Sequence, residues 1–359
     1  MKTRKIKKNI GLILPIMFLI TISLLNMYYA KYVSNLYDGL FYKQILWIIA
    51  GIILMIIISN INIKYFIKYH KIFYIMGIIS LVLVLIFGTK LNGSTAWFSF
   101  NKVRIQPSEI FKFFYIVSLC ITALDKKHKI LKLSILMILP VFLIFLEPDS
   151  GVALMYIIIY FAVIFNVINK KRYIVLILSL VFLISILFTY LYFLNDNLFI
   201  KIFGTSFFYR MDRLLDFKNN TSFQLSNALI GMGSSGLTGL GLKKSKIYVP
   251  ELTTDFSFCL TILNFGFMMG IVLVFVYTYM LLKIFSLTNT NNLFYKYYSS
   301  SVFLLMFYQI LEHIFMNLGL TPITGITLPF LSYGGSSIVS YFMIYGILLK
   351  ITTNSSSYN

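Results

Sequence analysis

The chain has few charged residues. Only 12% of its 359 residues are Asp, Glu, Lys or Arg, whereas 59% are hydrophobic, and soluble domains carry about 25% charged residues. This composition excludes an ordinary soluble globular protein and predicts a polytopic membrane protein. Acidic residues are the scarcest charged class, with 11 Asp and Glu against 31 Lys and Arg, which gives a net charge of +20.

The basic excess does not indicate nucleic-acid binding. The lysines stand between apolar runs, where such residues orient helices and meet anionic lipid headgroups. The clustering that a nucleic-acid-binding surface needs is missing. We therefore expect no nucleic-acid partner.

Cysteine and histidine are also scarce. Cys120 and Cys259 both lie in apolar runs and form no CxxC pair, which excludes a disulfide-stabilised scaffold. His70, His128 and His313 are far apart in the sequence and show no metal-ligand spacing.

Apolar runs of bilayer-spanning length fill most of the chain. A helix needs about 20 residues to cross the hydrocarbon core, and backbone groups in lipid must be satisfied within each segment, so we expect helices. The basic and apolar start resembles a signal peptide, but its apolar part is too long and no clear cleavage site follows, so we interpret it as a retained span. The sequence predicts an all-α polytopic membrane protein, a single transmembrane domain over residues 1–359, with about ten spans near 10–30, 41–60, 72–88, 108–124, 131–146, 151–168, 173–194, 255–285, 299–320 and 328–350.

The distribution of basic residues predicts the orientation of these spans. If the N-terminus is inside, the inner segments hold eighteen Lys or Arg and the short outer segments hold five. This bias follows the positive-inside rule and predicts that both termini are cytoplasmic. The long segment 195–254, between spans seven and eight, then faces outside, and loops of this length are usually functional or disordered. It contains the amphipathic piece YRMDRLLDF and the glycine-rich stretch GMGSSGLTGLGL.

Strongly polar residues at membrane depth are costly and usually functional, and the first such cluster is QPSEIFK, which ends at Lys112. Pro107 suits the first turn of a helix, and Glu109 suits its N-terminal end. Glu109 and Lys112 are three residues apart and share one helix face. The sequence leaves open whether they form a local ion pair at a helix start or a charge pair lining a cavity.

The second cluster is FLEPDSG, in which Glu147 and Asp149 flank a proline in a short outer connection. The acids are either solvated residues of a tight turn or a carboxylate pair at the outer rim, available to a cation or a sugar hydroxyl.

The third cluster is VPELTTDF, which ends a polar loop and opens an apolar run. Thr254 suits a helix cap, with Asp255 in the first helical turn, where the dipole favours a carboxylate. The alternative is that Asp255 is a general base or a metal-binding carboxylate at the outer surface.

The fourth cluster is LTPITGITLPFLSYGGSS, over residues 320–337, between two apolar runs. Irregular backbone of this kind is tolerated at membrane depth only when protein buries it or it lines a cavity. The alternative is a kinked hairpin between the last two helices.

Together these clusters resemble the SEDS family (shape, elongation, division and sporulation). PITGITLPFLSYGGSS is similar to the family's C-terminal pattern, QPSEIFK to its QPSE-x-x-K and EPDSG to its QPD-x-G. RMDRLLDF, FQLSNALIGMGSSGLTGLGL and YVPELTTDFSF follow in the family's order. The resemblance extends from about residue 93 to the last apolar run.

The resemblance implies a peptidoglycan glycosyltransferase in the bacterial cytoplasmic membrane. Family members polymerise lipid II at the outer face, as inverting enzymes that form β-1,4 linkages, together with a class B penicillin-binding protein. The resemblance implies no firm cofactor; a divalent cation, Mg²⁺ or Mn²⁺, held by Asp255 is the alternative to direct proton transfer.

The resemblance also assigns site residues. The family's essential aspartate falls on Asp255. The developing charge of the pyrophosphate leaving group should be stabilised by cationic groups. The candidates are Arg210, Arg213, Lys112 and Lys243, although lipid anchoring suits Lys243 better. The remaining substrate-binding or cavity residues are Glu109, Asp149, Glu251, Ser332, Tyr333, Gly334 and Gly335.

The sequence also departs from the family pattern. A GEE-like acidic triplet is replaced by Ile262, Leu263 and Asn264, and an Asn-Ile-Gly triplet begins here with His313. Two further functions remain alternatives to the polymerase. A flippase for lipid-linked precursors needs access from both faces and tolerates loss of Asp255, whereas a non-catalytic scaffold for a transpeptidase depends on its helix surfaces.

Overall fold

A computed structural model describes residues 2–91, 94–100, 103–168, 222–241 and 247–354. The described elements are α1 (Lys2–Ala30), η1 (Asn35–Tyr37), α2 (Leu40–Asn60), α3 (Ile63–Phe87), β1 (Thr89–Leu91), β2 (Ser94–Phe100), β3 (Val103–Ile105), α4 (Pro107–Thr122), α5 (Lys129–Leu146), α6 (Ser150–Val167), α10 (Phe223–Ser234), α11 (Ser257–Phe265), α12 (Phe267–Ser286), α13 (Leu293–Asn317) and α14 (Gly335–Asn354).

The fold is mostly helical, as the composition predicts. Within the described residues, eight helical segments are long and apolar enough to cross a membrane, in α1, α2, α3, α5, α6, α12, α13 and α14. α4 has only 16 residues, fewer than the run 108–124 suggests. The expected span 173–194 and the amphipathic piece YRMDRLLDF lie outside the described residues.

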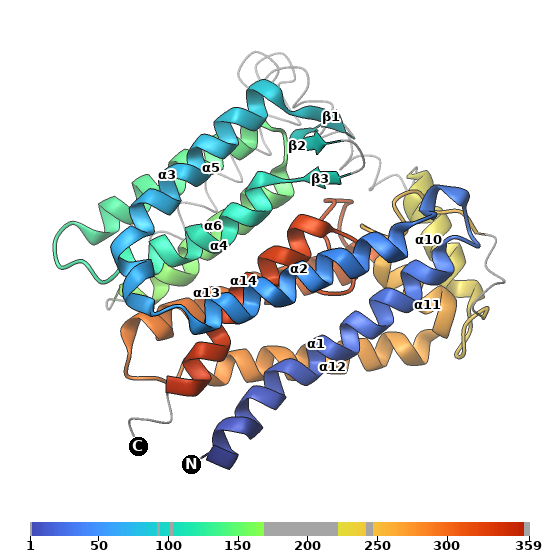
Figure 1. The fold of residues 1–359 in the computed structure, drawn as a ribbon. Coiled ribbons are helices and arrows are strands. Elements are labelled where there is room, and N and C mark those ends of the chain that lie inside the picture. Colours follow the sequence, from blue (N-terminus) through green and yellow to red (C-terminus); the bar gives the residue numbers. More distant parts are fainter. Residues whose placement is uncertain (1, 92–93, 101–102, 169–221, 242–246, 355–359) are drawn as a thin grey trace.

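Close helix contacts run through the middle of the bundle, where α2 and α14 lie side by side (Figure 1). A Cβ on Gly51 of α2 would come within 2.2 Å of the Phe342 ring, and one on Gly346 of α14 would come within 2.8 Å of Ile58. Small residues let membrane helices approach closely. The end of α14 also reaches the start of α1, where the Thr352 hydroxyl bonds to Asn9.

The expectation of a purely helical chain is wrong for the described residues 89–91, 94–100 and 103–105. They form a small antiparallel sheet in the order β1-β2-β3, which lies at one end of α3 and α4 (Figure 1). Thr95 of β2 donates its N–H to the Glu147 carbonyl at 3.1 Å, so the sheet is tied to the α5–α6 connection. A short sheet is tolerated here because it lies beyond the ends of the helices, where its edges need not face lipid.

The predicted span 255–285 is interrupted, which corrects the expectation of one helix. Gly266 separates α11 from α12 with φ +82°, and a Cβ there would lie 2.1 Å from the Leu237 carbonyl oxygen. Residues of the glycine-rich stretch enter this break: Leu240 donates its N–H to the Leu263 carbonyl at 2.9 Å, and Phe267 donates to the Gly236 carbonyl at 3.1 Å. The loop therefore satisfies backbone groups that the break exposes, as discontinuous membrane helices require.

Candidate functional site

Asp255 lies in a tight turn that precedes α11. The carbonyl of Glu251 accepts the N–H groups of Thr254, Asp255 and Phe256 at 3.2, 3.0 and 3.2 Å. The helix begins only at Ser257, so the expectation that Thr254 caps it and Asp255 sits in its first turn is wrong.

The physical reason is that other segments take the carbonyls of this turn. Thr253 O accepts the N–H of Tyr333 at 2.8 Å. Thr254 O accepts from the Ser332 hydroxyl at 2.8 Å, and Asp255 O accepts from the Asn317 amide at 2.9 Å. Three consecutive carbonyls are therefore held by tertiary contacts and are withdrawn from helical hydrogen bonding.

The surroundings of Asp255 favour its neutral form. Burial, the Glu251 carboxylate and the Asp149 carboxylate raise the pKa of Asp255 to about 7, against the hydrogen bond from Thr254. A carboxylate with a pKa near neutrality is suited to general-base chemistry, because it is ionised in part and still basic. Perturbed pKa values of this kind concentrate at functional sites.

The motif SYGGSS forms the wall next to this turn. The Ser332 hydroxyl accepts the Leu328 N–H at 2.8 Å and lies 2.7 Å from the Ser257 hydroxyl, while its carbonyl accepts from Gln44 of α2 at 3.2 Å. Tyr333 binds the turn through its backbone, and Gly334 and Gly335 lead into α14. A Cβ on Gly335 would lie 2.1 Å from the Trp47 ring, so close packing against α2 requires this glycine.

A glycine of the loop between α13 and α14 lies close to the Asp255 side chain. A Cβ on Gly325, which has φ +73°, would lie 3.7 Å from the Asp255 carboxylate oxygen Oδ2. The loop between α13 and α14 thus covers the Asp255 side chain closely. Within the irregular segment 320–334, residues 326 and 328–332 are buried in protein, whereas Leu320 is exposed.

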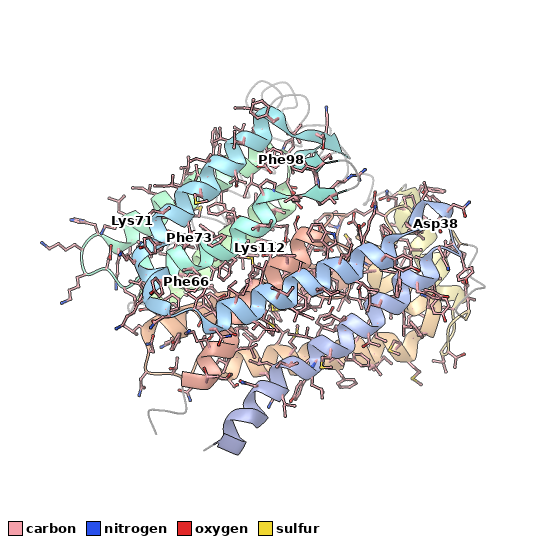
Figure 2. The ribbon with its side chains drawn as sticks, in the orientation of Figure 1. Asp38, Phe66, Lys71, Phe73, Phe98 and Lys112 are labelled. Atoms are coloured by element: carbon pink, nitrogen blue, oxygen red, sulfur yellow. The ribbon has the colours of Figure 1, made fainter. Side chains whose placement is uncertain are left out.

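A second polar cluster joins α4 and α6. Lys112 Nζ lies 2.8 Å from Glu109 Oε2, which confirms the pair that the spacing indicates, and Pro107 begins the helix as expected. Lys112, labelled in the side-chain view of Figure 2, is fully buried, and its Nζ lies 4.9 Å from the centre of the Tyr341 ring. A cation sealed in this way cannot reach a substrate phosphate in this conformation.

Asp149 caps α6 and connects the two clusters. Its Oδ1 accepts the Val152 N–H at 3.0 Å and its Oδ2 accepts from the Gln106 side chain at 2.8 Å. The Gln106 N–H in turn donates to Ser336 of the SYGGSS motif at 2.9 Å. Burial raises the pKa of Asp149 to about 6, with Glu109 adding to the rise.

The interpretation of FLEPDSG as a turn with solvated acids is wrong for Glu147. Its side chain is fully buried, and neither carboxylate oxygen has a hydrogen-bond partner among the described residues. Burial and the nearby Asp149 raise the pKa of Glu147 to about 8. The side chain is therefore largely protonated at neutral pH.

The structure identifies one cation that the sequence analysis did not select. Arg104 is an exposed residue of β3, two positions before Gln106. Burial raises the pKa of Tyr333 and the Arg104 guanidinium opposes this rise, so Arg104 lies near the SYGGSS motif. The sequence signal was its place just before QPSE. Arg210, Arg213 and Lys243 lie outside the described residues.

The residues that replace the family's acidic triplet face other helices. Leu263 packs against Gly231 of α10, and Asn264 donates to Asn26 Oδ1 of α1 at 3.1 Å. Both side chains are buried. Neither residue is among the hydrogen-bond partners described above for the Asp255 turn.

A metal ion at Asp255 would need ligands from elsewhere. Among the described residues, no group of three or more His, Cys, Asp or Glu side chains is placed to hold an ion. Asp255 lies within electrostatic reach of Glu251 and Asp149. Mg²⁺ is often held by one or two carboxylates together with substrate oxygens and water, so a cation at Asp255 would depend on ligands supplied by the substrate and by water.

These features define a polytopic helical membrane protein with a carboxylate site built by connections at one end of the bundle. The chain belongs to the FtsW/RodA/SpoVE family of cell cycle proteins, because the family model matches residues 6–357.

Individual relatives agree with this assignment. Stage V sporulation protein E of Bacillus subtilis is 28% identical over 387 residues, which cover 99% of this chain and 100% of that protein. The probable peptidoglycan glycosyltransferase FtsW of Methylomonas methanica is 31% identical over 333 residues, covering 86% and 82%. A chain from the solved structure of a peptidoglycan synthase complex matches the fold with a TM-score of 0.78 at 21% identity, covering 96% and 97%.

Proposed function

We propose that this chain is a peptidoglycan glycosyltransferase that polymerises lipid II at the Asp255 turn. The observation that carries the proposal is the turn itself, in which three held carbonyls fix a carboxylate whose pKa is about 7. Its relatives include a protein named as a peptidoglycan glycosyltransferase. Lipid II has a lipid tail and a pyrophosphate at headgroup level, so its enzyme needs polar groups at the end of a helical bundle.

The proposed reaction forms one glycosidic bond and breaks one bond to pyrophosphate. The 4-hydroxyl oxygen of the acceptor sugar attacks the anomeric carbon of the donor, the bond from that carbon to the pyrophosphate oxygen breaks, and Asp255 accepts the hydroxyl proton. The leaving group is the polyprenyl pyrophosphate, and the anomeric configuration inverts. General-base action of this kind contributes about 10²–10⁴-fold.

The two polar clusters have different roles in this proposal. Glu251, Ser332, Tyr333, Gly334 and Gly335 shape the Asp255 turn. Glu109, Lys112 and Asp149 form the wall behind the loop between α13 and α14. Arg104, exposed beside Tyr333, is the described residue suited to bind phosphate, because guanidinium groups form bidentate hydrogen bonds with phosphate oxygens. A divalent cation bound at Asp255 would supply further charge stabilisation.

The proposed topology has ten spans with both termini in the cytoplasm. The eight candidate spans support it, with α4 and the run 173–194 as the other two. The contact between the end of α14 and the start of α1 is consistent with termini on one side. The loop 195–254 and the Asp255 turn then face outward from the bacterial cytoplasmic membrane.

We further propose a class B penicillin-binding protein as partner. The support is the similarity of this fold to a chain of a peptidoglycan synthase complex in which polymerization and crosslinking are coordinated. The partner would crosslink the strands that this chain makes during cell elongation, division or sporulation.

The test is lipid II polymerisation by the purified protein with its partner. Wild type should form glycan strands, and Asp255→Ala should form none while keeping its melting temperature and its partner. Asp125→Asn is a matched control, because this exposed acid lies in the connection before α5 and pairs with Lys132 of α5. Strands from the Asp255→Ala variant, or none from wild type bound to its partner, would contradict the proposal and favour a scaffold or a flippase.

A further inference from the structure

We propose that His313 is a positioning residue for the Asp255 turn. This inference rests on the proposed function, because it concerns the geometry of the same carboxylate. His313 lies in α13, is fully buried and has no direct contact with the reacting groups, so any effect must pass through other residues.

The two ring nitrogens of His313 contact two different segments. Nδ1 lies 2.7 Å from the Ile326 carbonyl oxygen, in the loop that covers Asp255. Nε2 lies 3.1 Å from the hydroxyl of Ser257, the first residue of α11. His313 thus links the covering loop to the helix that follows the Asp255 turn.

A chain of hydroxyl groups extends this link to the turn. Ser257 Oγ lies 2.7 Å from Ser332 Oγ, and Ser332 Oγ donates to the Thr254 carbonyl at 2.8 Å. The carbonyl of Thr254 belongs to the peptide bond that carries the Asp255 N–H. A displacement of His313 is therefore passed through the hydroxyl groups of Ser257 and Ser332 to the peptide bond that precedes Asp255.

The donors and acceptors in this chain fix the state of the ring. A carbonyl oxygen only accepts, so Nδ1 must carry the proton that bonds to Ile326. Nε2 of a neutral ring then accepts from Ser257, and Ser332 has one hydrogen for two acceptors, Thr254 O and Ser257 Oγ. The ring is therefore coupled to the hold on Thr254, because a Ser257 hydroxyl that donates to His313 cannot donate to Ser332 and instead competes with Thr254 O for the Ser332 hydrogen.

The same face of α13 makes further contacts with both loops. Gln309, one turn before His313, donates to the Thr327 carbonyl at 2.8 Å. Asn317, one turn after it, donates to the Asp255 carbonyl and accepts the Cys259 N–H at 3.0 Å. Residues four apart share one helix face, so α13 acts as a rigid support, and His313 is its middle contact.

The experiment uses two variants that each keep one of the two contacts. In His313→Asn the amide lies where Nδ1 lay, so it keeps the bond to Ile326 and loses Ser257. In His313→Gln the amide reaches the position of Nε2, so it keeps Ser257. Ser118→Ala is the matched control for Ser257→Ala, because Ser118 is buried as Ser257 is. The Ser118 hydroxyl of α4 donates to the His70 carbonyl of α3, so its loss removes a buried hydrogen bond away from the Asp255 turn.

The readout is kcat and KM for lipid II in the complete complex with its partner. We expect His313→Asn and Ser257→Ala each to lower kcat about tenfold with KM changed less than twofold, since small displacements of a catalytic group cost up to about 100-fold. His313→Gln should recover most of the rate. The double variant His313→Asn/Ser257→Ala should be no slower than either single variant, because both break the same path.

Two kinetic results would overturn the inference. One is a His313→Asn enzyme as fast as wild type. The other is additive losses in the double variant, accompanied by lower melting temperatures or lost partner binding, which would indicate a purely structural role. If wild type itself makes no glycan while bound to its partner, the proposed function fails, and the imidazole ¹⁵N spectrum decides the inference. An Nδ1–H ring whose Nε2 signal shifts in Ser257→Ala supports the link; an Nε2–H ring, or no shift, refutes it.

Discussion

The pH dependence of polymerisation tests the assignment of Asp255 most directly. The ordinary pKa of an aspartate is 3.8, and burial with two neighbouring carboxylates raises that of Asp255 to about 7. A raised pKa means that the ionised base is present above pH 7 and is lost as the pH falls through 7. At pH 6 only about one tenth of the molecules hold an ionised Asp255, and at pH 8 about nine tenths do. We therefore expect kcat/KM to be about tenfold below its plateau at pH 6.

The Glu251→Gln variant separates this explanation from a general effect of acid. Its side chain keeps its shape and loses the charge that raises the pKa of Asp255, so the acidic limb of the profile should move to lower pH. Asp125→Asn, remote from the site, should leave the limb in place. The assay is the initial rate of glycan formation between pH 5 and pH 9 with partner and lipid held constant. A rate that stays flat down to pH 5, or a limb unmoved by Glu251→Gln, would refute the assignment of Asp255 as the titrating base.

Three further predictions concern other parts of the molecule. Arg104→Gln should raise KM for lipid II severalfold because it removes a phosphate-binding cation, whereas the exposed Lys90→Gln of β1 should not; equal KM values in kinetic assays would exclude Arg104 from the site. Lys112→Met should destabilise the fold by about 3–5 kcal/mol, because it leaves the Glu109 charge buried without its partner, and adding Glu109→Gln should restore part of this in thermal unfolding. Gly266→Ala should cost more than about 2 kcal/mol, since the backbone there suits glycine only and a Cβ meets the Leu237 carbonyl; Gly233→Ala, in α10 with open space around it, should be neutral or slightly stabilising, and equal melting temperatures would contradict the strained break.

Much of the helical frame can be predicted from hydropathy, because each span must satisfy its own backbone in lipid. The ion pair of Glu109 and Lys112 and the start of α4 at Pro107 follow from local spacing and are confirmed. The break at Gly266 could not be predicted, because it depends on carbonyls of residues 236 and 237 that enter from a distant loop. A hydropathy profile shows only one continuous apolar run at these positions and does not reveal the break.

The burial of Glu147 could not be predicted for a similar reason. An acid beside proline in a short connection is usually solvated, whereas in the structure the Glu147 side chain is fully buried and the backbone of the connection is bonded to the distant strand β2. The network through His313 also depends on contacts between distant segments, since Ser257 and Ser332 lie 75 residues apart. No spacing rule connects them.

Asp255 shows why the two interpretations of its motif predict opposite electrostatics. In the first turn of a helix, a carboxylate faces unsatisfied N–H groups, and these lower its pKa. In the structure the N–H groups of residues 254–256 point to the Glu251 carbonyl instead, and burial, together with the Glu251 and Asp149 carboxylates, raises the pKa of Asp255. The tertiary contacts that remove the turn from the helix therefore also create the basicity that the proposed reaction requires. It follows that mutations of the residues that hold these carbonyls, Asn317 and Ser332, should change the pH profile as well as the rate.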